Sequence, residues 1–258
     1  MSPRRTLVEL GVIVSVCGAL IAGALSLARW SAERYADSVP VSVDQTIGEQ
    51  SARIVLSTHA SCVDDRAERY VKEIAAPLVR ALDEHRFEFR FVVVDDAEVN
   101  AFALPGGFVT VNSGLLQAAE SGEEVAAVLA HEMQHVVRRH GTRRMLRELG
   151  AGALLGAVFG GTDVAVPARI VHDFASTAYD RAEESEADAR GLALLVRAGV
   201  DPRGMARFFE RLARISAAPP ALLSTHPDPG DRATRAARAA EGARVTLALP
   251  SPKGVLCR

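Results

Sequence analysis

Two histidines one helical turn apart, His131 and His135, constrain this 258-residue chain more than any other feature. Residues i and i+4 of an α-helix lie on one face, so both imidazoles can bind the same metal ion. Glu132 lies on the same side of the helix and can reach a water molecule without binding the metal. Since a catalytic zinc ion needs a third protein ligand and one open position, the fold must bring another ligand to this face.

The helix that carries this motif has recognisable ends. Ser121 and Glu124 have the spacing of an N-terminal capping box, and Gly141 supplies a stop, which predicts a helix over residues 122–140. The apolar residues that share the sector of Glu132 are Val125, Val128, Leu129 and Val136. The motif is therefore expected to be buried. A surface helix with two unrelated histidines fits less well, because an unpaired buried carboxylate is costly.

The third histidine of this segment, His140, is expected to face away from the metal. In a continuous helix it lies about 180° around the axis from His131. In another class of zinc protease the third histidine ligand would fall one residue later, where this chain has Gly141. We interpret His140 as a helix-end residue that the helix dipole favours.

A second acidic spacing, Glu184 and Asp188, lies further along the chain. On a helix the two carboxylates share a face, which suits Glu184 to be the third ligand of the metal. Asp188 could then accept a hydrogen bond from the outer nitrogen of a ligand histidine and fix its tautomer. The alternative is a solvated acidic face paired with Arg181 and Arg190. The histidine motif upstream favours the ligand interpretation.

Three sequence blocks carry a family resemblance. They are residues 100–116, which contain Leu104-Pro105-Gly106-Gly107, residues 128–135 with the histidine motif, and residues 181–188; Thr225-His226-Pro227 with Arg232 is a weaker fourth. In this order and spacing, over about residues 61–240, the chain resembles the membrane-associated zinc metallopeptidases of the HtpX, Oma and CAAX-prenyl-protease type, peptidase family M48. It departs from them in having Asp180 where serine is usual, and in lacking the intervening membrane spans of some relatives.

The resemblance implies a zinc endopeptidase with one Zn²⁺ per chain. It implies His131, His135 and Glu184 as ligands and Glu132 as the general base. The expected fold is α+β, a mostly helical zincin-like (gluzincin) domain with a small β-sheet or hairpin, preceded by one N-terminal transmembrane helix. A zinc-stabilised chaperone-like or scaffold module without proteolysis is the alternative. The intact Glu132 favours the enzyme, because a structural zinc site has no use for a general base.

Residues 87–113 suggest where a substrate could bind. The alternating residues Phe87, Phe89 and Phe91 lead into an apolar run that ends at residue 94 and predict one strand. A turn at residues 104–107 precedes a second strand, formed by Phe108, Val109, Thr110 and Val111. The family resemblance implies that this second strand binds an extended peptide through backbone hydrogen bonds. The alternative is a hairpin that only covers the core.

His226 and Arg232 are further candidates for catalysis. Pro227 favours an extended backbone at His226, so the imidazole is expected to project from a loop. His226 could donate a hydrogen bond to the oxyanion of the transition state, with Arg232 adding positive charge. It could instead occupy the open zinc position in a resting state and keep the enzyme latent. The alternative is a loop histidine before the N-cap Asp228, without a catalytic role.

The N-terminal segment predicts a location. Residues 10–28 carry no charge and are long enough to cross a bilayer, so we expect a single-pass signal anchor after a tail over residues 1–9; cleavage after Ala28 is the alternative. Residues 29–60 are expected to be a tether, residues 61–246 the catalytic domain on the periplasmic, extracytoplasmic side, and residues 247–258 a tail. Residues 149–161 are expected to be a packing helix or a segment that contacts lipid.

Cysteines and charge complete the prediction. Cys62 and Cys257 are the only cysteines outside the predicted anchor, and an oxidising compartment favours a disulfide between them over two free thiols. A net charge of −2, and a basic cluster over residues 138–147 without aromatic residues, give no support for nucleic-acid binding. The expected partners are polypeptides, unfolded or from the membrane and envelope, together with membrane lipid. The sequence does not indicate an oligomeric state.

Overall fold

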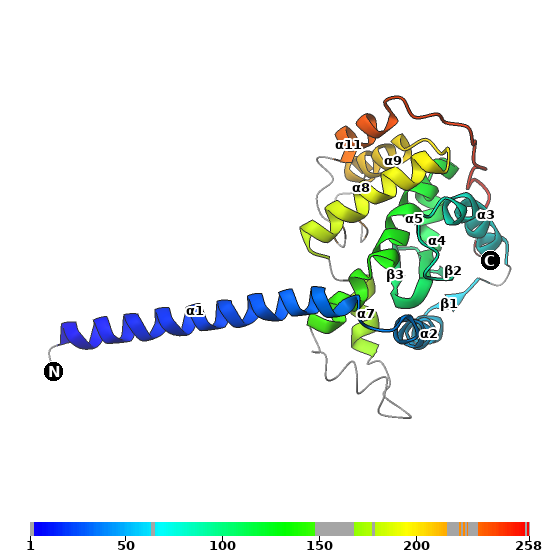
Figure 1. Cartoon of the computed structure of the whole chain (residues 1–258). Helices are drawn as coiled ribbons and strands as arrows, with labels where there is room; N and C mark the ends of the chain where they lie inside the picture. Colours follow the sequence, from blue (N-terminus) through cyan, green and yellow to red (C-terminus); the bar gives the residue numbers. More distant parts are fainter. Residues whose placement is uncertain are drawn as a thin grey trace.

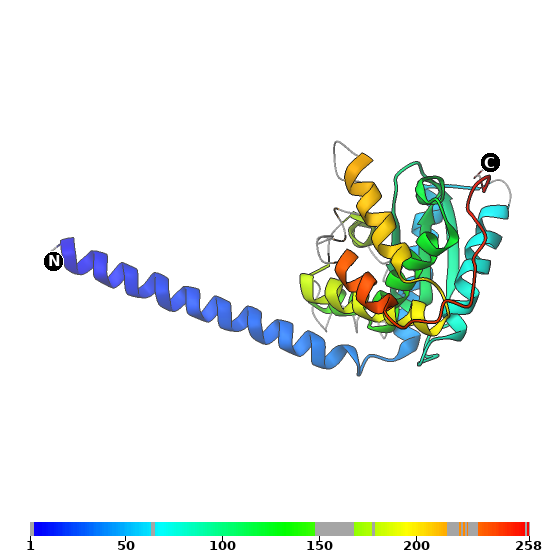
Figure 2. The same ribbon diagram turned by 90° about the horizontal axis from the view of Figure 1, so that it is seen from above.

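A computed structural model describes residues 3–62, 65–147, 168–176, 179–215, 222, 224, 226, 232–255 and 257. The predicted segment over residues 149–161 lies outside them. A long helix, α1 (Pro3–Ala36), projects from a domain in which helices surround a small sheet (Figures 1 and 2). Over the described part of the chain, no helix combines the length and the apolar character needed to cross a membrane. The predicted span over residues 10–28 is not supported by this finding.

The predicted tether contains a helix that packs on the domain. Residues 41–58 form α2 (Val41–Thr58), and its buried residues Ile47 and Val55 join an apolar cluster with Phe102 of the sheet. A Cβ atom at Gly48 would collide with the carbonyl oxygen of Pro105, so α2 lies directly against the turn that precedes the last strand. The prediction of a tether is wrong for these residues, because α2 has a buried apolar face.

The sheet has four strands in the order β1-β2-β4-β3. The strands are β1 (Ala60–Ser61), β2 (Arg90–Asp95), β3 (Ala101–Leu104) and β4 (Phe108–Asn112). β2 and β4 are parallel, whereas β3 and β4 form an antiparallel pair joined by the 3-10 turn η1 (Pro105–Gly107). Gly106 and Gly107 have φ values of 77° and 104° in this turn, which favour glycine. The hairpin of this chain is therefore β3–β4.

The position of β4 overturns one prediction. Both sides of this strand are paired, with β2 on one side and β3 on the other. A peptide can add only to a strand with a free edge. Phe108, Val109, Thr110 and Val111 therefore cannot bind a substrate by backbone pairing, and the terminal strand of the described sheet on that side is β3.

The histidine motif lies on the central helix of the domain, α5 (Gly122–Val137), as Figure 1 shows. The surrounding helices are α3 (Arg66–Arg80), α4 (Ser113–Ala118), α7 (Ala168–Ser176), α8 (Arg181–Arg197), α9 (Arg203–Ile215) and α11 (Arg232–Ala240). Leu129 and Met133 of α5 are fully buried in one core with Ile74 of α3, Leu194 of α8 and Phe208 of α9. The domain is mostly helical with a small mixed sheet, as the sequence predicts.

The end of α5 differs from the prediction. The helix stops at Val137, Arg139 adopts a left-handed φ of 56°, and the chain is helical again over residues 140–147. Gly141 is therefore not the stop but part of the second helix. The guanidinium of Arg139 donates to the Val39 carbonyl at 2.8 Å and lies 2.6 Å from the buried carboxylate of Asp44 on α2. This pair offsets the cost of a left-handed backbone at a residue other than glycine.

The C-terminal segment is attached to the domain along its length. Cys62 and Cys257 form a disulfide, which confirms that prediction. The Tyr70 hydroxyl of α3 donates to the Pro250 carbonyl at 2.9 Å, and the Leu249 amide donates to a carboxylate at the start of α5 at 3.2 Å. The predicted C-terminal tail, residues 247–258, therefore contacts α3 and α5 through Pro250 and Leu249.

Removal of the disulfide should destabilise the domain. Replacing Cys62 and Cys257 together by serine should lower the free energy of unfolding by about 2–4 kcal/mol, because the unfolded chain gains freedom when the crosslink is lost. Urea denaturation of the full chain measures this change. Cys17→Ser is the matched control, since Cys17 is an exposed free thiol on α1. An unchanged urea midpoint in the double variant would contradict the prediction.

Candidate metal centre

The two helices that carry the site are both capped at their N-termini. At α5 the Glu124 amide donates to the Ser121 hydroxyl, but the Glu124 carboxylate pairs with Arg211 at 2.5 Å, so the predicted capping box is half formed. At α8 the Asp180 side chain accepts from the Glu183 amide at 2.9 Å and the Glu183 side chain accepts from the Asp180 amide, which completes a box. Aspartate therefore serves at the position where serine is usual, because it caps equally well.

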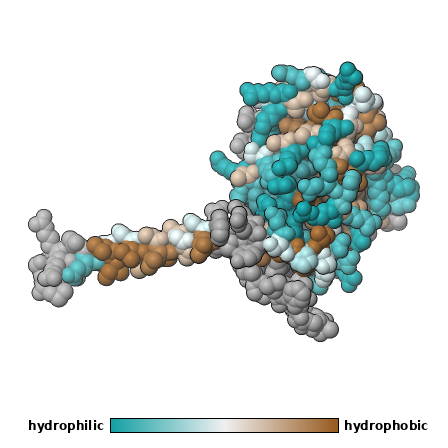
Figure 3. Space-filling view, viewed as in Figure 1, coloured by the Kyte–Doolittle hydropathy of each residue, from teal (hydrophilic) through white to brown (hydrophobic). Residues whose placement is uncertain are grey.

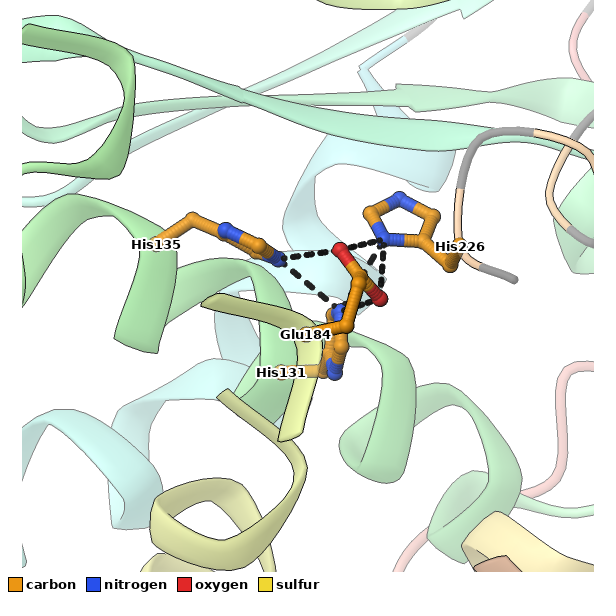
Figure 4. A group of neighbouring side chains, drawn as sticks. All are labelled: His131, His135, Glu184 and His226. Carbon is orange, nitrogen blue, oxygen red and sulfur yellow. Dashed lines mark hydrogen bonds and ion pairs between the residues drawn. The ribbon is translucent and has the colours of Figure 1, made fainter. Parts of the chain in front are cut away.

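Four buried side chains converge on one point (Figure 4). They are His131 and His135 of α5, Glu184 of α8, and His226 from the segment before α11, and their ligand atoms all lie within 4.8 Å of one another. The Nε2 atoms of His131 and His135 are 3.0 Å apart, and His226 Nδ1 is 3.0 Å from Glu184 Oε1. Three imidazole nitrogens and a carboxylate at these separations fit the donor types and the size of a zinc site.

The outer nitrogen of the first ligand histidine has a carboxylate partner. His131 Nδ1 lies 2.9 Å from Asp188 Oδ1, and both side chains are buried. This is the contact that the spacing of Glu184 and Asp188 leads one to expect. With Nδ1 as the donor, the Nε2 lone pair of His131 is directed at the metal position.

The outer nitrogen of the second ligand histidine has a different partner. His135 Nδ1 lies 2.9 Å from His140 Nδ1, and the ring of Tyr179 stacks on the His135 ring with centroids 4.0 Å apart. The prediction that His140 faces away from the metal is wrong. It assumed a continuous helix, whereas the left-handed turn at Arg139 folds His140 back toward α5.

Glu132 has the environment of a base that awaits a substrate. Its side chain is fully buried, and neither carboxylate oxygen has a hydrogen-bond partner among the described residues. His226 Nε2 lies 3.4 Å from Glu132 Oε1. Burial raises the pKa of Glu132, although the nearby His226 and His131 oppose the shift. A carboxylate with a raised pKa is a better proton acceptor near neutral pH.

The electrostatics of the site favour a cation at its centre. Burial disfavours the ionised form of Glu184, but His226 and His131 outweigh this effect and hold its pKa far below the usual range. At His131, burial alone would lower the pKa. The carboxylates of Glu184 and Asp188 outweigh this effect of burial and raise the pKa of His131 to about 10. The carboxylates therefore stabilise a positive charge at this point, which a bound metal ion can supply.

Arg232 lies among carboxylates, and its predicted role at the oxyanion stays a prediction. Its guanidinium is 1% exposed, donates to Asp188 Oδ2 at 2.7 Å and to Glu184 Oε2 at 3.1 Å, and lies 4.2 Å from the ring centre of Phe209. It also reaches the His226 carbonyl at 3.3 Å. Its Nε, Nη1 and Nη2 atoms each donate to one of these partners, so Arg232 holds the two carboxylates in place.

Two contributors were not identified from the sequence. Arg235 Nη2 donates to Asp188 Oδ2 at 3.2 Å; its i, i+3 spacing from Arg232 on one helix is a signal that could have indicated a shared partner. Tyr179 precedes the Asp180 cap directly, but nothing in the sequence marks it as the residue that stacks on His135.

Comparison with known proteins gives a consistent result. A family model described as Peptidase family M48 matches residues 65–240. The chain is 34% identical over 211 residues to a putative beta-barrel assembly-enhancing protease of Vibrio cholerae serotype O1, covering 75% of this chain and 44% of that protein. It is 30% identical over 212 residues to the beta-barrel assembly-enhancing protease of Escherichia coli strain K12, covering 76% and 43%. Over 149 residues it is 35% identical to the mitochondrial metalloendopeptidase OMA1 of Arabidopsis thaliana, covering 57% and 31%. The chain spans less than half the length of each of these relatives.

The metal site can be tested by binding. The full chain should hold about one zinc ion, and Glu184→Gln or His135→Ala should lower the affinity by more than the roughly 10–100-fold loss that is typical when an outer partner of a ligand is removed. Competition with a chromogenic chelator measures the affinity. His172→Ala is the control, because His172 is exposed on α7. Equal zinc affinity in Glu184→Gln and the control would exclude Glu184 as a ligand.

Proposed function

The chain belongs to peptidase family M48, and on that premise we propose that it is a zinc-dependent endopeptidase that hydrolyses peptide bonds with a water molecule. The observation that carries the proposal is the buried carboxylate of Glu132 next to the four-residue metal cluster, 3.4 Å from His226 of that cluster. Closure by four protein ligands is also typical of a structural zinc site, which is what the scaffold alternative requires. A purely structural site, however, has no use for a buried carboxylate beside its ligands, which is costly to keep out of water.

Each residue of the site has a part in this mechanism. Zinc, when bound, supplies Lewis-acid activation of water and of the scissile carbonyl. Glu132 accepts a proton from the attacking water and transfers it to the nitrogen of the leaving amine, so that protons balance over the reaction. Glu184 stays ionised because its pKa is lowered, whereas that of Glu132 is raised. These opposite pKa shifts suit Glu184 to bind the metal as an anion and Glu132 to accept a proton.

Glu132→Gln tests the mechanism directly. The amide has the same shape but cannot accept the proton, so we expect turnover of casein to fall by about 10²–10⁴-fold while zinc affinity is kept. Glu73→Gln on the exposed surface of α3 is the matched control and should cleave casein at the normal rate. Proteolysis by Glu132→Gln at the rate of the control would refute the assignment of Glu132 as the base.

We propose that His226 holds the site in a resting state, the second of its two predicted roles. Its Nδ1 belongs to the metal cluster, and its Nε2 lies 3.4 Å from Glu132 Oε1, so the ring lies between a ligand and the base. The backbone leading to it is also engaged, since the Leu222 amide donates to the Val99 carbonyl just before β3. A histidine that bound the oxyanion would leave space for the substrate carbonyl, whereas the Nδ1 of His226 lies 3.0 Å from Glu184 and 3.1 Å from His131 Nε2.

His226→Ala separates the two roles by the sign of its effect. Removal of the blocking ligand should populate the competent state more, so kcat/KM for casein or a quenched peptide should rise. The factor of the rise is the inverse of the fraction of unmodified protein molecules that are already competent. The His172→Ala variant should leave it unchanged. A fall of about 10²-fold would instead assign His226 to the stabilisation of the transition state. That result would overturn the resting-state proposal.

Polypeptides are the proposed substrates, and envelope protein quality control is the proposed setting. The names of two relatives, beta-barrel assembly-enhancing proteases, support this setting. β3 replaces β4 as the strand to which an extended peptide would add, because it is terminal in the described sheet and packs against α5. Mass spectrometry of casein fragments tests the idea: cleavage confined to chain ends would exclude an endopeptidase.

We further propose an extracytoplasmic location at a membrane. The Cys62–Cys257 disulfide supports an oxidising compartment. α1 projects from the domain with an apolar surface (Figure 3). Its exposed large apolar side chains are Leu10, Val12, Ile13, Val14, Val16, Leu20, Ile21 and Leu27. Recovery of the full chain in the soluble fraction of cells, with both cysteines reactive to a thiol label, would contradict this location.

A further inference from the structure

His140 and Glu186 form a chain of contacts that ends on a ligand histidine. His140 Nδ1 lies 2.9 Å from His135 Nδ1, and His140 Nε2 lies 3.3 Å from Glu186 Oε2. The His140 side chain has no exposed surface, so these two atoms are the polar neighbours that its ring nitrogens have among the described residues. The mechanism above assigns no part to either residue.

The direction of the hydrogen bonds follows from the position of the metal cluster. His135 places Nε2 at the cluster, 3.0 Å from His131 Nε2, so its proton is on Nδ1 when Nε2 binds a metal. That Nδ1–H can donate only to an unprotonated His140 Nδ1. His140 then carries its proton on Nε2 and donates it to Glu186. One arrangement of protons satisfies both contacts, and it leaves His135 in the tautomer that binds metal.

Both members of the pair are held in place by other residues. Glu186 Oε1 forms an ion pair with Arg138 at 2.8 Å and accepts a hydrogen bond from Arg190 at 2.9 Å, which leaves Oε2 for His140. His140 follows Arg139, whose left-handed backbone turns the chain and whose guanidinium is paired with Asp44 of α2. The pair is thus anchored on α8 at one end and, through this turn, on α2 at the other.

We propose that His140 and Glu186 are positioning residues that fix the tautomer and the ring orientation of His135. The proposal rests on the zinc site of the proposed function. The two ligand histidines are then supported differently: His131 by a carboxylate directly, and His135 by an imidazole that is itself supported by a carboxylate. Tyr179 restricts the face of the same ring by stacking at 4.0 Å. Loss of such outer partners usually weakens metal binding without removing a ligand.

A core histidine that merely satisfies its neighbours would have a different signature. Its replacement would change the stability of the metal-free domain and leave the geometry of the metal site alone. A positioning residue changes the affinity for the metal and the ligand field around it. Zinc affinity and the absorption spectrum of the cobalt-substituted protein therefore distinguish the two, and neither needs turnover.

The test uses the full chain in a Glu132→Gln background, so that self-cleavage does not interfere. His140→Phe keeps the ring volume but removes the acceptor, and we expect zinc affinity about 10–100-fold below that of the parent, with altered cobalt bands. His140→Asn places an amide oxygen near the position of Nδ1 and should recover most of the affinity. Glu186→Gln removes the charge at the end of the chain and should give a smaller loss in the same direction. His172→Phe, on exposed α7, is the control.

The outcomes separate this proposal from the proposed function. A parent chain that binds no zinc would overturn the zinc site, and this proposal with it. A parent that binds zinc, with His140→Phe and Glu186→Gln equal to it in affinity and in cobalt spectrum, would overturn only the positioning role. If His140→Phe does not fold, Glu186→Gln decides in its place: zinc affinity and a cobalt spectrum equal to those of the parent would overturn the proposal.

Discussion

The burial of Glu184 and Asp188 at one point is the constraint on which the rest of the site depends. Two carboxylates out of water are costly unless positive charge and hydrogen bonds surround them. Arg232 reaches both, and His131 contacts both. These contacts draw α5, α8 and α11 together at the same place. The helices are therefore positioned by the electrostatic needs of the metal site as well as by their apolar faces.

A second buried pair extends this arrangement to the N-terminal side of the domain. Asp44 of α2 and Arg139 beyond the end of α5 are both almost without exposed surface and lie 2.6 Å apart. Burial raises the pKa of Asp44, and Thr142 and Arg139 oppose this shift. The turn that Arg139 makes also directs His140 to the ring of His135. Asp44 of α2 is thus connected, through the turn at Arg139, to His140 and so to the ligand His135.

The site combines features of an active and of a closed metal centre. Glu132, which has no hydrogen-bond partner among the described residues, is what hydrolysis needs, whereas in the proposed resting state His226 would take the position of water or a substrate. The same segment contacts the chain just before β3 through the Leu222 amide.

The sequence by itself determined the local parts of this site. The i, i+4 spacing fixes His131 and His135 on one helical face and Glu184 and Asp188 on another, because the helical period acts over a few residues. The tertiary structure alone decided that β4 is central, that α2 packs on the domain, that Arg232 binds carboxylates, and that His140 supports His135. Each of these depends on contacts between residues distant in the sequence or, for His140, on one left-handed residue that interrupts the helical period. Periodicity cannot report such contacts, because they arise only when the helices and the sheet pack against one another.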